Sequence, residues 1–186
     1  TKKEPNYSNV ASALAVNALY KEVFRESVDS DTFDLQYKKS FVQGVKKLVK
    51  NEILSPRLLD YDLKKLSEAI DPERDKKFKY LGLQILIDRY FIRVNNKIIE
   101  SPQAFWMRIA MGLALNEDNK EERAIEFYNL FSNLLYTPST PTLFNSGTTH
   151  SQLSSCYLNT FDDSIDGIFE GVWQEARKSK YAGGLG

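Results

Sequence analysis

The residues best able to do chemistry gather toward the end of the sequence. The single cysteine, Cys156, and the single histidine, His150, both lie in STPTLFNSGTTHSQLSSCYL, residues 139–158, a stretch rich in hydroxyl side chains. A thiol can act as a nucleophile or a reductant, but a redox cycle needs a partner thiol, and the sequence has no second cysteine. His150 has no Asp, Glu or Cys at ligand spacing, so we expect it at the solvated surface. Without further context, the commonest role of a free cysteine is that of a small buried apolar side chain.

Three further features near the end of the sequence could bind a ligand, and each also has a structural explanation. Asp163 precedes a helical pattern, so its carboxylate could cap that helix or accept hydrogen bonds from a sugar hydroxyl. The run AGGLG, residues 182–186, would let the backbone approach a substrate, although loops often contain such runs. Lys180 could neutralise a phosphate or favour a helix C-terminus. The residues alone leave these alternatives open.

The composition excludes several classes of protein. The 186 residues contain 25 Lys and Arg and 25 Asp and Glu, so the formal net charge of zero gives no general attraction to nucleic acid or to an anionic membrane. Hydrophobic residues make up 42% of the chain, which is enough for a folded core. One cysteine fits a reducing compartment, and no apolar run is long enough to span a bilayer. The first residues lack the apolar core of a signal peptide. We therefore expect a cytoplasmic polypeptide with no membrane or nucleic-acid polymer as partner.

Apolar residues recur at helical spacing over most of the chain up to Tyr136. The segment 78–90 is apolar nearly all round, which predicts a buried helix. Two short branched runs flank Asn95-Asn96, the signal of a small hairpin near 91–99. The helices predicted in this part of the chain are 10–24, 41–54, 55–70, 78–90, 101–115 and 120–136.

The character of the sequence changes after Tyr136. Two X-Pro steps disfavour helix at Thr137 and Thr140, and residues 145–147 form a turn signal. Residues 154–161 then predict a short strand, and residues 164–180 predict an amphipathic helix. The apolar face of that helix is formed by Ile165, Ile168, Phe169, Val172, Trp173 and Ala176.

Several sequence motifs follow one another in an order that resembles that of a known protein family. TPTLFNSGT, QLSSCYL, DDSIDGIF and SKYAGGLG follow one another, and RYFIRVNNKIIESPQAFWMRIAMGLAL lies upstream. From about residue 75 to 186 the chain resembles an N-terminal segment of the large (catalytic, alpha) subunit of ribonucleoside-diphosphate reductase, the radical enzyme that makes deoxyribonucleotides. The resemblance implies a mainly α fold, with a helical N-terminal domain over 1–136. Residues 137–186 would begin a ten-stranded α/β barrel with its first strand and helix.

The resemblance also implies a role for each candidate residue. Cys156 would be one of the paired active-site cysteines that reduce the ribose and end as a disulfide. The helix over 164–180 would pack against its copy in a large-subunit dimer. The expected contacts to a nucleoside diphosphate substrate are Thr140, Ser155, Cys156 and the backbone of Gly184. The expected contacts to a (deoxy)nucleoside triphosphate effector are Asp163, Ser164, Ile165 and Lys180.

The family's other requirements lie outside this sequence. Its radical cysteine and second redox cysteine are missing, so we expect a complementary polypeptide that carries the rest of the barrel and pairs with strand 153–158. A split gene, an intein junction or a prepared fragment would each explain this. The chain is expected to bind no metal or cofactor itself. The radical would come from a metal-containing small subunit in class I or from adenosylcobalamin in class II, and electrons from a thioredoxin- or glutaredoxin-type reductant.

Two other functions fit some of the sequence. A non-catalytic helical module that binds nucleotide or a partner could have kept these motifs only as structure. An independent thiol enzyme is disfavoured, because His150 has no evident carboxylate to orient it.

Overall fold

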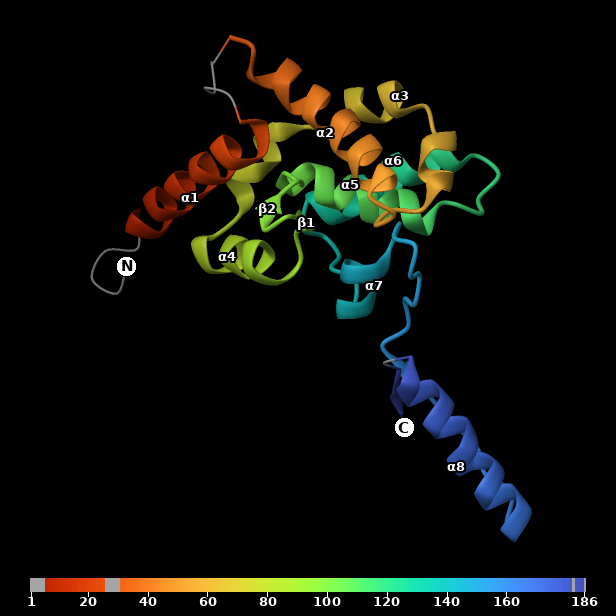
Figure 1. Ribbon diagram of the computed structural model, residues 1–186. Helices are drawn as coiled ribbons and strands as arrows, with labels where there is room; N and C mark the ends of the chain where they lie inside the picture. The colour runs from red at the N-terminus through yellow and green to blue at the C-terminus, as the bar shows by residue number, and fades with distance from the viewer. Residues whose placement is uncertain (1–5, 26–30, 182, 186) are drawn as a thin grey trace.

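The structure is a computed structural model that describes residues 6–25, 31–181 and 183–185. Figure 1 shows helices α1 to α6 packed into one body, with α7 at its lower edge and α8 pointing away from it. The predicted, mainly α fold is confirmed. The helices are α1 (Asn6–Phe24), α2 (Phe33–Lys50), the 3-10 helix η1 (Pro56–Asp60), α3 (Leu63–Glu68), the 3-10 helix η2 (Pro72–Lys77), α4 (Tyr80–Arg89), α5 (Pro102–Leu113), α6 (Lys120–Ser132), α7 (Thr140–Asn145) and α8 (Ile165–Lys180). The strands are β1 (Arg93–Val94), β2 (Lys97–Ile98), β3 (Cys156–Tyr157) and β4 (Gly184–Leu185).

Helix α5 forms the centre of the core. Every residue from Pro102 to Met111 is buried, and the helix packs along α6. Its sequence explains this position, because apolar residues occupy all sides of the helix instead of one stripe. Two polar side chains, Gln103 and Arg108, are buried with them. A buried polar group without a hydrogen bond is costly, so these two residues need partners inside the protein.

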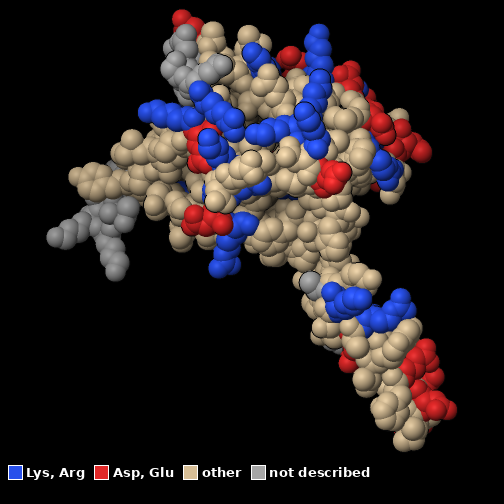
Figure 2. All heavy atoms as spheres, viewed as in Figure 1, with Lys and Arg blue, Asp and Glu red and all other residues tan. Residues whose placement is uncertain are grey.

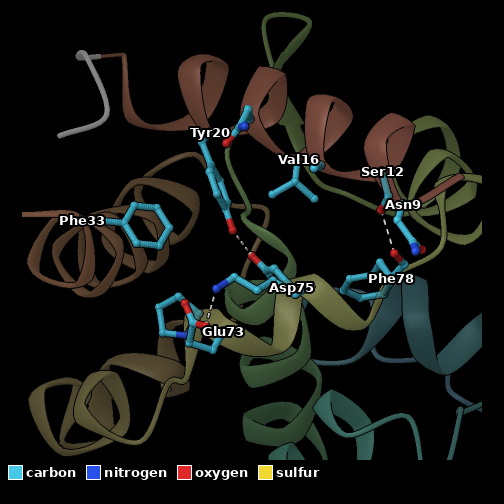
Figure 3. Close-up of a pocket in the computed structure, with 12 residues that line it drawn as sticks. Asn9, Ser12, Val16, Tyr20, Phe33, Glu73, Asp75 and Phe78 are labelled. Atoms are coloured by element: carbon cyan, nitrogen blue, oxygen red, sulfur yellow. Dashed lines mark hydrogen bonds and ion pairs between the residues drawn. The ribbon is translucent and has the colours of Figure 1, made fainter. Parts of the chain in front are cut away.

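Gln103 finds its partner in the carboxylate of Asp75, which lies on η2 and is 1% exposed. Gln103 Nε2 donates to Asp75 Oδ1 at 2.6 Å, while the hydroxyls of Tyr20 and Tyr37 donate to Oδ2 at 2.7 and 2.8 Å. Figure 3 shows Tyr20 reaching from α1 to Asp75 beside a pocket of about 560 Å³. The network therefore ties α1, α2, η2 and α5 together.

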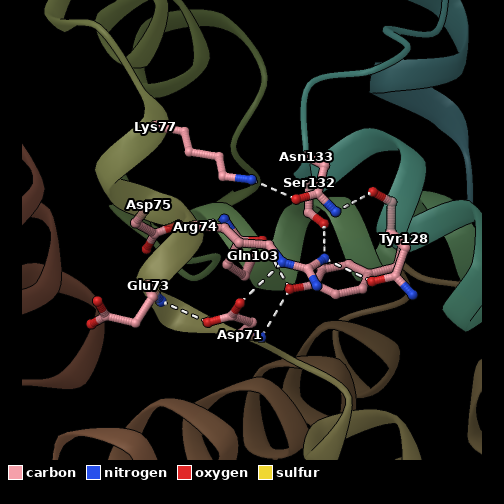
Figure 4. A network of polar contacts seen from close by, with 10 residues as sticks. Asp71, Glu73, Arg74, Asp75, Lys77, Gln103, Tyr128, Ser132 and Asn133 are labelled. Atoms are coloured by element: carbon pink, nitrogen blue, oxygen red, sulfur yellow. Dashed lines mark hydrogen bonds and ion pairs between the residues drawn. The ribbon is translucent and has the colours of Figure 1, made fainter.

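A second network holds η2 against α6. The Arg74 guanidinium donates to Asp71 Oδ2 at 3.1 Å, to Asn129 Oδ1 at 2.7 Å and to Ser132 Oγ at 2.5 Å (Figure 4). It also lies 5.2 Å from the centre of the Tyr128 ring, within the range of a cation–π interaction. The Tyr128 hydroxyl donates to Gln103 Oε1 at 2.9 Å. The two networks are thus continuous through Gln103 and Tyr128.

The helix predicted over 55–70 is wrong as a single element. The chain forms η1 and then α3, with Tyr61 and Asp62 between them. The Asp62 carboxylate accepts hydrogen bonds from the backbone N–H groups of Lys64 and Lys65, both at 3.0 Å. An aspartate in this position caps a new helix and so ends the preceding one.

The helix predicted over 41–54 is also shifted. Helix α2 starts earlier, at Phe33, and ends at Lys50. Glu52 has a φ of 58°, a left-handed conformation that turns the chain out of the helix. The backbone N–H groups of Ile53 and Leu54 then both donate to the carbonyl of Leu48.

The hairpin prediction is confirmed, whereas the burial predicted for 78–90 is wrong. Strands β1 and β2 pair antiparallel, and Asn95 and Asn96 have φ values of 51° and 61°. Asparagine tolerates this conformation better than most residues, as a two-residue hairpin turn requires. In α4 only Leu83 and Leu86 are buried, and Leu81 is 70% exposed, because the helix lies at the edge of the body (Figure 1).

The segment after Tyr136 contains a helix where the X-Pro steps predicted none. Helix α7 begins at Thr140, with Pro141 in its first turn. Proline is tolerated there because the first helical N–H groups have no partner within the helix. Among the helices of the described residues, none is long and apolar enough to cross a membrane.

We expect the free energy of unfolding to fall as pH rises from about 4 to about 7, because burial raises the pKa of Asp75 to about 6. An aspartate in an unfolded chain ionises near pH 3.9, so the folded state binds the extra proton in this interval. At about 1.4 kcal/mol per pKa unit, Asp75 alone lowers stability by about 3 kcal/mol.

Urea unfolding at several pH values would measure this effect, with the Asp75→Asn variant as the control. Asparagine does not titrate, so subtracting its pH profile isolates Asp75 from the other carboxylates. Identical slopes for the two proteins would contradict the prediction.

Candidate functional site

Cys156 lies on a strand that pairs with the end of the same chain. Strands β3 and β4 are parallel, with Cys156 opposite Gly184, and α8 forms the connection between them. The backbone N–H of Gly184 donates to the carbonyl of Ser155 at 3.2 Å. Cys156 is an exposed free thiol, with its Sγ 3.9 Å from Ser155 Oγ. Three of the four expected substrate contacts are therefore neighbours: Ser155, Cys156 and Gly184.

Gly184 allows this close approach because it has no side chain. A Cβ atom at this position would lie 2.6 Å from the carbonyl oxygen of Ser155 and 3.4 Å from Cys156 Sγ. The glycine-rich run was predicted to bring backbone close to a ligand; in the structure, part of it is the strand β4. One edge of β3 is thus occupied by the chain itself, and the expected pairing of strand 153–158 with a second polypeptide stays a prediction for its other edge. No strand lies at its other edge in the described residues.

The fourth expected substrate contact, Thr140, begins α7 and is exposed. Its hydroxyl lies 3.3 Å from the hydroxyl of Tyr90, at the end of α4. Tyr90 also packs on Phe144, with ring centres 4.6 Å apart. The first turn of α7 is therefore positioned by the helical body.

Helix α7 is also linked to the segment that leads into β3. Thr142 Oγ1 donates to the carbonyl of Leu153 at 3.0 Å, and Asn145 Nδ2 donates to that of Gln152 at 2.7 Å. These bonds end a few residues before Cys156. The hydroxyl-rich segment and the thiol strand thus share one local framework.

The C-terminal end of α7 is held by a buried ion pair. Arg108 on α5 is 1% exposed, and its Nε donates to Glu100 Oε1 at 2.6 Å. Its remaining donors reach the carbonyl oxygens of Ser146 at 2.7 Å and Leu143 at 3.3 Å. Because Arg108 belongs to the central helix, it fixes the α7 loop directly on the core.

Glycines let the loop after α7 lie directly on α5. A Cβ atom at Gly112 would be 2.1 Å from the backbone nitrogen of Gly147, and Gly147 has a φ of 78°. Ser146 Oγ donates to the carbonyl of Ile109 at 2.7 Å. The next residues bond to the turn after α2, where the Thr149 N–H donates to the Ile53 carbonyl.

The expected effector residues Asp163, Ser164 and Ile165 lie together at the start of α8. The helix cap is Ser164, whose Oγ accepts a hydrogen bond from the Gly167 N–H at 3.0 Å. The capping alternative for Asp163 is therefore wrong, and the residue is exposed. The serine performs this role because it immediately precedes the first helical residue.

Lys180 lies at the opposite end of α8. A helix of 16 residues is roughly 24 Å long, so Lys180 cannot contact the same small ligand as Ser164 within one chain. Figure 2 shows acidic side chains at the outer end of α8 and basic side chains at the end near the body. This distribution is favourable for the helix dipole.

The apolar face predicted for α8 is present but uncovered. Trp173 is 56% exposed and Phe169 is 68% exposed, and the large apolar residues on both sides of them are exposed too. A contiguous exposed apolar face of this kind is typical of an interaction surface.

Sequence reasoning missed Arg108, Glu100 and Asp75. One signal was available for Arg108, since it is the only charge in the apolar run AFWMRIAMG. Nothing local identified Glu100 as the partner of Arg108, or Asp75 as the partner of Gln103. Among the described residues, no group of three or more His, Cys, Asp or Glu could hold a metal ion.

Comparison with known proteins identifies the family. Residues 76–151 match the model of the ribonucleotide reductase all-alpha domain. The chain is 47% identical over 186 residues to ribonucleoside-diphosphate reductase subunit alpha of Chlamydia pneumoniae, a match that covers 99% of this chain and 18% of the relative. It is 41% identical over 183 residues to subunit alpha of Helicobacter pylori, covering 98% of this chain and 22% of that protein. It is 38% identical over 192 residues to the large subunit of Monkeypox virus, covering all of this chain and 24% of that protein.

The matched residues run from the end of η2 through α4, the hairpin and α5 to α7 as far as the loop held by Arg108. The chain belongs to the ribonucleotide reductase large-subunit family and contains its N-terminal all-alpha domain. It spans about a fifth of the length of these curated relatives.

We expect Gly112→Ala to lower the free energy of unfolding by about 1–3 kcal/mol, the usual cost of overpacking a core. The new methyl group would meet the backbone of Ser146 and Gly147, which cannot rotate away as a flexible side chain can. Hydrogen exchange should also accelerate at residues 146–149.

Gly82→Ala on α4 is the matched control, since a Cβ there has nothing within 4 Å. Alanine in a helix should stabilise the protein by about 0.5–1 kcal/mol relative to glycine. Equal effects of the two substitutions would show that the 146–147 turn does not pack on α5 as described.

Proposed function

We propose that this chain supplies a substrate-binding wall and one redox thiol to ribonucleoside-diphosphate reductase. The observation that carries the proposal is the exposed thiol of Cys156, set beside Ser155 and Gly184 in the parallel pair β3–β4. The relatives of the chain are named as the alpha or large subunit of that enzyme. An exposed thiol on a short strand is accessible to a ribose, unlike a cysteine packed in a core.

In this proposal Cys156 acts together with a second cysteine from the rest of the barrel. The two thiols give two electrons and two protons to the ribonucleotide, one ribose hydroxyl leaves as water, and the two sulfur atoms end as a disulfide. A thioredoxin- or glutaredoxin-type protein then reduces the disulfide. Thr140, Ser155 and the backbone of Gly184 hold the nucleoside diphosphate. The positions of these residues on one framework support this assignment.

The remaining requirements of the reaction come from partners. A complementary polypeptide, or the rest of a longer chain, supplies the radical cysteine and closes the barrel that begins at about residue 137. A metal-containing small subunit in class I, or adenosylcobalamin in class II, supplies the radical. We place the whole assembly in the cytoplasm.

The expected effector residues lie at opposite ends of α8, so they can contact one ligand across a dimer but not within a single chain. If α8 packs antiparallel against α8 of a second copy, the acidic start of one helix meets the basic end of the other. Lys180 of one copy then lies near Asp163, Ser164 and Ile165 of its partner. The exposed apolar face of α8 supports this arrangement, because pairing would remove that face from water.

We expect Cys156→Ser to abolish CDP reduction, because a hydroxyl cannot form the disulfide. The assay uses this chain combined with the remaining polypeptide of its enzyme and a radical source. His150→Ala is the control, since His150 is exposed and lies on the same segment.

The His150→Ala variant should keep nearly full activity. Full activity of Cys156→Ser would exclude the redox role and favour a helical module that binds nucleotide or a partner without catalysis. Loss of activity in His150→Ala alone would point instead to an independent thiol enzyme.

We expect Val172→Glu to weaken self-association of the chain by more than about ten-fold, because pairing would bury an unpartnered charge in the apolar face. Gln174→Glu adds the same charge to α8 at a residue outside that face and should have little effect. Sedimentation velocity over a range of concentrations measures both. Equal dimerisation of all three proteins would exclude α8 as the interface.

A further inference from the structure

A small hollow lies between the end of α1 and the middle of α2, away from Cys156 and α8. Its volume is about 150 Å³, the space of about five water molecules at about 30 Å³ each. Its lining consists of Val23, Phe24, Arg25, Ser40, Gln43, Gly44, Lys47 and Ile99.

One face of α2 supplies most of the polar lining. Ser40, Gln43 and Lys47 follow one another at helical spacing, so they share one side of the helix. Arg25 approaches from the end of α1, where a φ of 59° turns the chain. The floor is apolar and includes Phe24 and the buried Ile99. The hollow thus combines two cations, a hydroxyl and an amide above an apolar base.

The cations at this hollow lack carboxylate partners. Within the described part of the chain, no ion pair involves Arg25, Lys47 or the nearby Lys97. By contrast, Lys38 on the same helix is within 3.0 Å of both Asp34 and Glu68. The carboxylate of Glu22, one turn before Arg25, already accepts the Ile98 N–H at 2.8 Å.

The electrostatic field at the hollow is positive. The pKa of Lys47 is lowered, first by burial and then by the charges of Arg25 and Lys97. In Figure 2 basic side chains gather over the side of the body where α2 lies. An anion in the hollow would relieve the repulsion among these three cations.

We propose that the hollow is a binding site for the phosphate group of a small phosphorylated ligand, held by Arg25 and Lys47. Arginine and lysine give phosphate strong, charge-assisted hydrogen bonds. The Ser40 hydroxyl and the Gln43 amide add neutral donors, and neither side chain has another hydrogen-bond partner in the described residues. The site does not depend on the proposed reductase activity.

NMR titration of the chain with inorganic phosphate tests the proposal, with chloride used to hold the ionic strength constant. Saturable shifts should gather at the amides of residues 25, 40, 43, 44 and 47. Lys47→Met should weaken the apparent affinity about ten-fold, the usual value of one charge-assisted hydrogen bond. Lys50→Met removes an equal charge from the exposed end of α2 and should change affinity less than about two-fold.

A second variant tests the role of Arg25, and two further ligands distinguish a nucleotide from free phosphate. Arg25→Met should reproduce the loss seen with Lys47→Met. Tighter binding of ATP than of phosphate, without binding of adenosine, would assign the phosphate to a nucleotide, and equal binding would assign it to the free ion. Shifts spread over all lysines, or equal losses in Lys47→Met and Lys50→Met, would overturn the proposal.

Discussion

Helix α5 is enclosed on all sides, and its polar side chains, apart from the indole N–H of Trp106, make hydrogen bonds within the described residues because an unpartnered polar group there is costly. Two buried polar side chains of α5, those of Gln103 and Arg108, bind different parts of the protein. Gln103 binds Asp75 and Tyr128 and so fixes η2 and α6, while the tyrosines that share Asp75 fix α1 and α2. Arg108 binds Glu100 and two carbonyls after α7. The arrangement of the helices and the position of the α7 loop therefore both follow from satisfying polar groups on one buried helix.

The two buried networks differ in their electrostatics. The charge of Glu100 is balanced by Arg108 at 2.6 Å, so the loss of water around each is offset by the other. The carboxylate of Asp75 accepts only neutral donors, from two tyrosines and one glutamine. Those bonds favour the charged form, but burial outweighs them and raises the pKa of Asp75 to about 6. The contact between Arg108 and the α7 loop thus rests on a balanced charge pair, whereas the contacts that Asp75 makes between α1, α2 and η2 lose stability as pH rises and its carboxyl group ionises.

The candidate site lies where the helical body passes into the β3–α8–β4 unit. The contacts that hold the α7 part of the site differ from those that hold Cys156. Thr140 is held by Tyr90, and the end of α7 by Arg108, so this part has the rigidity of the core. Cys156 lies in a short parallel pair whose strand is also tied to α8 through Lys178, and the start of α8 is exposed. Because the curated relatives are more than four times as long as this chain, further polypeptide is the natural source of contacts for these exposed surfaces.

The sequence by itself determined what depends on neighbours in the chain. Helical spacing predicted α5, α6 and α8, Asn95-Asn96 predicted the hairpin, and the order of the motifs indicated the family. Only the tertiary structure decided what depends on residues far apart. It exposed α4 despite its apolar sequence, gave Arg108 its partners at Glu100 and Ser146, and set Cys156 opposite Gly184 across the whole length of α8. The physical reason is that capping, periodicity and turn conformation are local energies, whereas burial and charge compensation depend on which distant segment covers a residue.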